Sequence, residues 1–171
     1  MMLECYIVSD KFFDLKSIKN LYQQSFPKNE LSPFKLLLNP QVTTYAFYDK
    51  SDFIGFISIL GHLDIINIIY FAIANNKRSQ GYGSQILSQL KLKFPKHRII
   101  VDIEAENKQA DNNLQRQQRK RFYLKNGFHI TTIAYHWRNE DYIILIDGND
   151  ITAKEFDDFW NYFTKNSSLQ F

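Results

Sequence analysis

The chain has 171 residues, of which 44% are hydrophobic, so it is long and apolar enough for one globular domain, and a largely disordered protein is excluded. Its net charge of +3 is too small to require a nucleic-acid partner, and its apolar runs fall far short of the ~20 residues of a membrane span. The single cysteine, Cys5, excludes an internal disulfide and a thiolate-rich metal site.

The first half of the chain predicts a strand, a helix, a short helical insert and three strands. The start, MMLECYIVSD, lacks the basic segment of a signal peptide, so we expect a cytoplasmic protein, with Cys5 as a small buried side chain. Apolar spacing and turn residues place these elements at Leu3–Val8, Phe12–Phe26, Pro33–Leu38, Val42–Tyr48, Asp52–Leu60 and Ile65–Ala74. The last three strands should form an antiparallel meander.

The second half predicts alternating helices and strands. These are a helix from Ser79 to Phe94, a strand at Arg98–Ile103, a helix at Asn113–Leu124, strands at Phe128–Trp137 and Tyr142–Asp147, and a helix at Ile151–Phe163. A strand–helix–strand connection of this length makes Arg98–Ile103 parallel to the strand before it. We expect one domain over 1–171, with a core at 1–147 and a helical extension at 148–171.

Two glycines one residue apart, Gly81 and Gly83, separate the strand IIYFAIA from an apolar helix. Glycine there gives a ligand access to main-chain N–H groups, and a helix N-terminus attracts anions. A Walker loop would need Lys-Ser/Thr after Gly83, and a dinucleotide fingerprint would need glycine at Ile86, so neither nucleotide fold is supported. The alternative is that both glycines serve only a turn and a tight helix start.

The stretch Arg78–Gly83, R-x-x-G-x-G, resembles the acetyl-CoA signature of the GCN5-related N-acetyltransferase (GNAT) family. A second family landmark, an aromatic pair followed by Gly-Phe, is matched by Phe122–Phe128. The predicted order β-α-α-β-β-β-α-β-α-β-β is similar to the family's over roughly the first 147 residues. The resemblance implies an α/β fold with a mixed central sheet and a splayed parallel strand pair, here with an extra C-terminal helix.

The same resemblance implies acetyl-CoA as co-substrate and suggests which residues hold it. Main-chain groups of Phe71, Ala72 and Ile73 match the positions that pair with the pantetheine arm, and one N–H there would stabilise the oxyanion. The pyrophosphate would lie on Arg78, Ser79, Gln80, Gly81, Tyr82, Gly83 and Ser84. Asn107 and Asn113 are candidates for the pantetheine or adenylate, although helix capping is the commoner use of Asn.

The resemblance implies that Tyr123 protonates the leaving thiolate, and the alternative is a core tyrosine. Ile69 stands where many relatives carry a glutamate base, so that role does not carry over. Glu104, at the end of the next strand, is the substitute, with Asp102 on the same face to attract the amine. Both carboxylates are equally well read as ordinary strand-end residues. Glu30 is a further acidic candidate for binding the substrate, or a solvated loop charge.

These residues predict an N-acetyltransferase in which a small-molecule or peptide amine attacks acetyl-CoA directly in a ternary complex. Alternatives are an inactive acyl-CoA sensor or interaction module and, less favoured, a nucleic-acid-binding protein that uses the basic helix Arg116–Arg121, which could instead meet the coenzyme's 3′-phosphate or be a solvated face. The four histidines lack metal-ligand spacing, so we expect no metal. Trp160 and Phe163 either pack on the core or form a homodimer contact.

Overall fold

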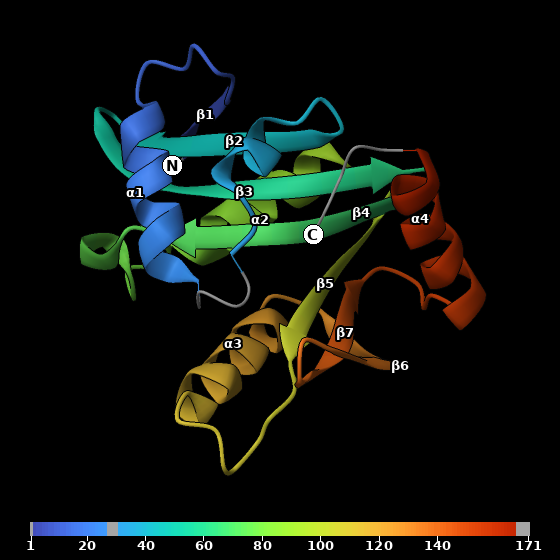
Figure 1. Cartoon of the computed structure of the whole chain (residues 1–171). Coiled ribbons are helices and arrows are strands. Elements are labelled where there is room, and N and C mark those ends of the chain that lie inside the picture. Colours follow the sequence, from blue (N-terminus) through green and yellow to red (C-terminus); the bar gives the residue numbers. More distant parts are fainter. Residues whose placement is uncertain (1, 27–30, 167–171) are drawn as a thin grey trace.

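The computed structural model describes residues 2–26 and 31–166. In that part of the chain, strands form one mixed sheet in the order β1-β2-β3-β4-β5-β7-β6 (Figure 1). Their bounds are β1 Glu4–Ile7, β2 Val42–Asp49, β3 Asp52–His62, β4 Ile65–Ile73, β5 Arg98–Glu104, β6 His129–Trp137 and β7 Glu140–Asp147. The predicted meander is confirmed, because β2, β3 and β4 pair antiparallel in sequence order. The α/β fold class with its mixed sheet is therefore confirmed.

The parallel pair β4–β5 separates part-way along its length. Pairing runs only from Ile65 with Arg98 to Ile68 with Val101, although β4 continues to Ile73 and β5 to Glu104. Figure 1 shows β5 turning away from β4 and carrying β7 and β6 with it. The predicted splay is thus present, and we call the space between the separated ends the fork. Asp102 is the first β5 residue beyond the last pair.

Helices cover both faces of the sheet. They are α1 Leu15–Ser25, α2 Tyr82–Lys93, α3 Asn113–Lys125 and α4 Ala153–Asn166, with short 3-10 turns η1 Phe34–Leu38 and η2 Asn75–Lys77. Side chains of α1, η1 and α4 form one buried cluster with β2, β3 and β4, and those of α2 and α3 form a second on the other face. In Figure 1, α1 accordingly lies in front of the sheet and α2 behind it.

Three details differ from the sequence prediction. The helix expected from Ser79 begins at Tyr82, because Ser79 and Gly81 have positive φ angles of 60° and 85° that a right-handed helix cannot contain. Cys5 is exposed, not buried as expected, because β1 is an edge strand whose residues are all exposed. On α4, Phe163 is buried in the same cluster as Phe159, so its ring packs on the core and is not available for a dimer contact.

Candidate active site

The glycine loop forms an open helix N-terminus. The first intrahelical bond of α2 runs from the Gln85 N–H to the Gly81 carbonyl, so the N–H groups of Tyr82, Gly83 and Ser84 have no partner within the helix. No side chain caps this end, and its first turn holds no acidic residue. Unpaired N–H groups at the positive end of a helix dipole are suited to a phosphate group.

Gly81 and Gly83 are required for different physical reasons. Gly81 adopts the left-handed φ of 85°, and a Cβ there would meet no atom within 4 Å, so its backbone angle alone requires glycine. At Gly83 a Cβ would lie 3.1 Å from the ring of Phe122. This glycine therefore lets α2 approach α3, which holds the aromatic pair of the second landmark.

The glycine loop is connected to the fork by β4. Opposite β3, the register jumps from Tyr70 with Ser58 to Ile68 with Ile59, which leaves Ile69 as a bulge. On its other side β4 has no β5 partner beyond Ile68. Phe71, Ala72 and Ile73 thus form a strand edge open to a strand-like ligand. The Arg78 guanidinium donates through Nε to the Ile73 carbonyl at 3.1 Å, so that carbonyl is already engaged.

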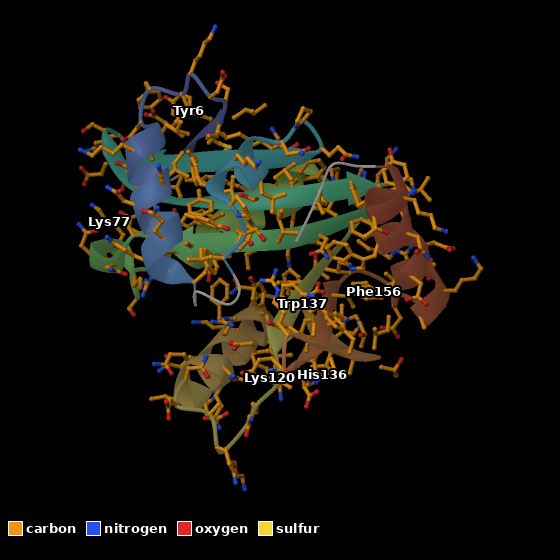
Figure 2. The ribbon with its side chains drawn as sticks, in the orientation of Figure 1. Tyr6, Lys77, Lys120, His136, Trp137 and Phe156 are labelled. Atoms are coloured by element: carbon orange, nitrogen blue, oxygen red, sulfur yellow. The ribbon has the colours of Figure 1, made fainter. Side chains whose placement is uncertain are left out.

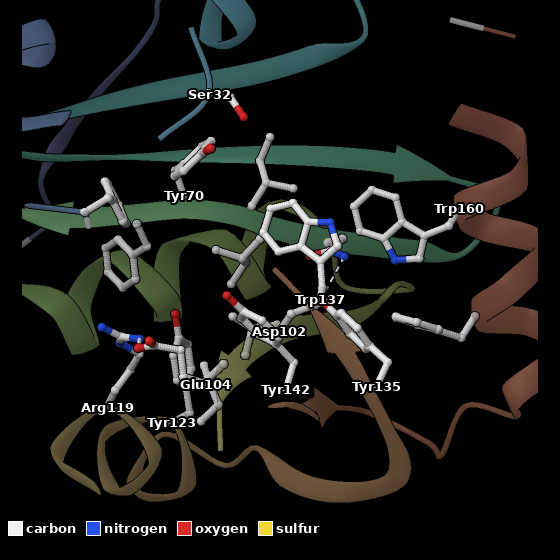
Figure 3. A pocket seen from close by; sticks show the side chains of 18 of the residues that line it. Ser32, Tyr70, Asp102, Glu104, Arg119, Tyr123, Tyr135, Trp137, Tyr142 and Trp160 are labelled. Carbon is white, nitrogen blue, oxygen red and sulfur yellow. Dashed lines mark hydrogen bonds and ion pairs between the residues drawn. The ribbon is translucent and has the colours of Figure 1, made fainter. Parts of the chain in front are cut away.

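A pocket of about 430 Å³ occupies the fork. Its walls come from Asn67–Phe71 on β4, Val101–Glu104 on β5, α3, β6, β7 and α4, with Phe26 and Ser32 at one side. In Figure 3, Tyr123, Glu104 and Arg119 lie at one end, Asp102 lies near the middle, and Tyr135, Trp137 and Trp160 lie toward the other end. We call the end with Tyr123 the tyrosine end and the end with Trp160 the aromatic end.

At the tyrosine end, Tyr123 is buried and its hydroxyl has no hydrogen-bond partner among the described residues. Burial raises the pKa of Tyr123 above its ordinary value, and the nearby Arg119 cation opposes that rise. Arg119 is held by an ion pair of 3.0 Å with Glu104. The phenol therefore stays protonated and is available as a hydrogen-bond donor to a ligand in the pocket.

Glu104 is engaged by two arginines. Its carboxylate lies 3.1 Å from the buried guanidinium of Arg116 and 3.0 Å from that of Arg119, and only 3% of its side chain is exposed. Arg116 also pairs with Glu140 at 2.8 Å. Both oxygens of the Glu104 carboxylate are therefore already engaged in ion pairs with guanidinium groups.

Asp102 has a different environment. Oδ2 accepts a hydrogen bond of 2.7 Å from the Tyr135 hydroxyl, and Oδ1 accepts one of 3.2 Å from the Asn67 amide. Among the described residues, no cation contributes to the environment of Asp102. Loss of solvation raises the pKa of Asp102 to about 6, although the two hydrogen bonds oppose this shift. The raised pKa of Asp102 therefore comes from burial, and the neighbouring Glu104 is not among its causes.

The aromatic end is built by three elements. On β6 the inward positions include Tyr135 and Trp137, and Tyr135 stacks on Tyr142 of β7 with ring centroids 5.3 Å apart. Phe156 of α4 lies 6.0 Å from Tyr135 and 6.5 Å from Trp160. Figure 2 shows Trp137 and Phe156 near each other, whereas Lys77 lies at the opposite side of the view. Each of these rings contacts the next, so together they form a continuous aromatic wall of the pocket.

Comparison with known proteins identifies the family. A family model described as "Acetyltransferase (GNAT) domain" matches residues 40–130. This match covers more than half of the chain and includes the glycine loop, the fork and the aromatic pair. The chain belongs to the GNAT family of acetyltransferases. The chain matches no curated protein sequence.

Solved structures share the fold of this GNAT chain. A protein from Bacteroides thetaiotaomicron assigned to the GNAT family superposes with a TM-score of 0.77 at 18% identity, covering 98% of this chain and 99% of that one. The ribosomal-protein-S18-alanine N-acetyltransferase of Escherichia coli gives 0.63 at 18% identity, covering 88% and 97%. A GNAT acetyltransferase from Elizabethkingia anophelis with acetyl-CoA bound gives 0.62 at 16% identity, covering 86% and 98%.

The remaining site residues predicted from the sequence lie outside the pocket or outside the described residues. Glu30 falls outside the described residues. Asn113 begins α3, and its Oδ1 accepts a 2.8 Å hydrogen bond from the Asn107 N–H, which is a loop-stabilising use of the side chain. No group of three or more His, Cys, Asp or Glu that could hold a metal occurs within residues 2–26 and 31–166. No helix in that part is long and apolar enough to span a membrane.

The basic segment Arg116–Arg121 is not a free stripe of charge. Arg116 is buried, Arg119 pairs with Glu104, and Lys120 pairs with Glu106 at 3.0 Å. Most of the cations that a phosphate backbone would need are thus engaged with carboxylates of the same chain. These contacts argue against the nucleic-acid alternative.

Sequence reasoning missed the aromatic end. Tyr135, Trp137, Tyr142 and Phe156 line the pocket, but the sequence predicts them only as strand or helix residues. Trp160 also lines the pocket, whereas the sequence predicts a core or dimer contact for it. The alternation along β6, which places Tyr135 and Trp137 on one face, was the one available signal. That signal does not reveal that the face is opposite α4.

Proposed function

We propose that this enzyme transfers the acetyl group of acetyl-CoA to a primary amine, with both substrates bound together in the fork. The observation that carries this is one pocket lined by a buried tyrosine hydroxyl and by a carboxylate with no cationic partner among the described residues. An acid for the leaving thiolate and a base for the attacking amine are the two groups that such a transfer needs.

We assign the base to Asp102, where the sequence favoured Glu104. With a pKa of about 6, Asp102 is ionised at neutral pH and can accept a proton. A poorly solvated site destabilises the charged pair of carboxylate and ammonium relative to the neutral pair of carboxylic acid and amine. This promotes transfer of a proton from the substrate ammonium to Asp102. Glu104 then acts as a positioning residue, because its ion pair holds Arg119 near Tyr123.

We assign the acid to Tyr123. Its hydroxyl is protonated at neutral pH, and Arg119 stabilises the negative charge that the ring would acquire on donating its proton to the thiolate. Asp102 takes one proton from the bound ammonium, and Tyr123 gives its proton to the thiolate and regains one as the amine nitrogen loses its second. Asp102 then releases its proton to solvent, so the products are an amide, free coenzyme A and one proton. A main-chain N–H of Phe71, Ala72 or Ile73 would stabilise the oxyanion of the intermediate.

The coenzyme would lie with its pyrophosphate at the N–H groups of Tyr82, Gly83 and Ser84 and its pantetheine along β4. We retain Arg78, Ser79, Gln80 and Asn113 as further coenzyme contacts. A covalent acyl-cysteine route has no support, because Cys5 lies on edge strand β1 and does not line the pocket. We therefore propose direct attack in a ternary complex. The cytoplasmic location and the absence of a metal remain predictions.

A thermal-shift titration with acetyl-CoA tests coenzyme binding, with NAD and ATP as controls. At ~100 times its dissociation constant, a ligand stabilises the folded state by ~2.7 kcal/mol, or roughly 5–11 °C for a domain of this size. A shift with acetyl-CoA alone supports the site. Release of free coenzyme A in the presence of amines then separates an enzyme from the inactive sensor, and binding without release would favour the sensor.

A further inference from the structure

The acceptor side of the pocket combines one carboxylate with a wall of aromatic rings. Asp102 lies where β4 and β5 separate, and its two hydrogen-bond donors among the described residues, Tyr135 and Asn67, are both neutral. Burying an ionised carboxylate without a cation costs free energy that a bound cation recovers. A single ammonium group next to Asp102 would satisfy this site.

The other charges that line the pocket are already paired. Arg119 is its one cationic side chain among the described residues, and it is bound to Glu104 at the tyrosine end. A substrate carboxylate, as in a free amino acid, would therefore find no cation among the described residues of the aromatic end. A second ammonium group would find no second unpaired carboxylate in the described lining, and would be buried against rings.

The aromatic rings favour an apolar body on the amine. Tyr135, Tyr142, Trp137, Phe156 and Trp160 present ring faces and edges, which pack against aromatic or aliphatic groups and attract an ammonium ion through their faces. The volume of about 430 Å³ must also admit the reactive end of the coenzyme, so the acceptor is small.

We infer that the acceptor is a small primary monoamine with an aromatic or aliphatic body, with its ammonium at Asp102 and its body against the aromatic end. This inference rests on the proposed function, because it names the substrate class of the same site. Polyamines, aminoglycosides and amino acids with a free carboxylate carry additional charges that the described lining residues do not match, so we expect them to be poorer acceptors.

The chain offers a direct probe of occupancy. Its two tryptophans, Trp137 and Trp160, both line the pocket, so intrinsic fluorescence reports on binding without any need for turnover. The protein saturated with coenzyme A would be titrated with hexylamine and with 1,6-diaminohexane, which differ in one ammonium group. It would also be titrated with 2-phenylethylamine and phenylalanine, which differ in one carboxylate.

We expect saturable fluorescence changes with both monoamines, and affinities at least about tenfold weaker for the diamine and for phenylalanine. In acetyl transfer, measured as free thiol released, kcat/KM should follow the same order. Trp160→Leu should raise KM for 2-phenylethylamine by roughly tenfold. The matched control is Tyr162→Leu, on the same helix, where the exposed ring stacks on His62 away from the pocket lining and should leave KM unchanged.

Tighter binding or faster acetylation of the diamine or of phenylalanine would overturn the inference while leaving acetyl transfer intact. Failure of the proposed function has a different signature, namely no thermal shift with acetyl-CoA. If coenzyme binds and none of the four amines alters the fluorescence or releases thiol, the assigned acceptor class is wrong.

Discussion

Replacing Asp102 with asparagine tests the assigned base, because the change removes the charge and keeps the shape. The amide oxygen can accept the bond from Tyr135. The new NH₂ group can donate to Oδ1 of Asn67, which is buried without a partner among the described residues, once the Asn67 amide turns over. The local structure should therefore persist, so a loss of activity would report on chemistry.

The size of the effect follows from the two roles of the carboxylate. A general base contributes about 10²–10⁴-fold, so kcat/KM for the amine should fall by that factor in Asp102→Asn, equivalent to ~3–5 kcal/mol of transition-state stabilisation. In the unmodified enzyme, kcat/KM should fall about tenfold per pH unit below the Asp102 pKa of about 6. The variant should lack this acidic limb.

Asp102→Asn should raise the stability of the folded state although it lowers activity. The pKa of Asp102 is raised from 3.8 to about 6 on folding, so the folded state binds the proton more tightly and loses stability as the pH rises through this window. Above pH 6 the full cost is ~3 kcal/mol, and below pH 3.8 it is absent. Asp102→Asn should therefore raise the thermal midpoint at pH 7.5 and lose this advantage near pH 3.5.

Two assays check this reasoning, namely thiol release against pH and thermal unfolding against pH. A variant that keeps more than about a tenth of the activity would refute the base assignment, given the contribution expected of a general base. A variant less stable than the unmodified protein at pH 7.5 would show that the carboxylate is not poorly solvated.

Three further substitutions address the neighbouring groups. Tyr123→Phe should lower kcat by about 10²-fold without weakening acetyl-CoA binding, and an unchanged kcat in steady-state assays would remove Tyr123 from the mechanism. Glu104→Gln should destabilise the fold by ~3 kcal/mol, since Arg116 remains buried with one carboxylate fewer, and equilibrium denaturation measures this. Gly83→Ala should cost ~1–3 kcal/mol through contact with Phe122, seen in the same denaturation experiment. A raised midpoint would show that the ring moves freely, because Ala then adds its better helix propensity.

Local patterns predicted the parts of the site that lie close together in the sequence. Alternation and helical spacing located the strands and helices, and Arg78–Gly83 predicted an open helix N-terminus suited to a phosphate because such an end is a local structure. The splay of β4 and β5 came from the family resemblance, since a parallel strand pair read from sequence does not show where its pairing stops.

The environment of each carboxylate was beyond sequence reasoning. Asp102 and Glu104 are two residues apart on one strand, yet one meets Tyr135 of β6 and Asn67 of β4 while the other meets Arg116 and Arg119 of α3. Burial and pairing depend on these long-range contacts. For the same reason the sequence did not predict that Arg116 is buried, because the run Arg116–Arg121 has the composition of a solvated helix face.

The aromatic end is made by elements that leave the ribosome after the glycine loop. During synthesis, the glycine loop, β4 and β5 emerge before β6, β7 and α4, so a nascent chain holds its proposed coenzyme segment before Asp102 has the Tyr135 hydroxyl as a partner. Phe156 and Trp160 join the pocket wall later still. The order of translation thus places the proposed coenzyme segment ahead of the wall of aromatic rings.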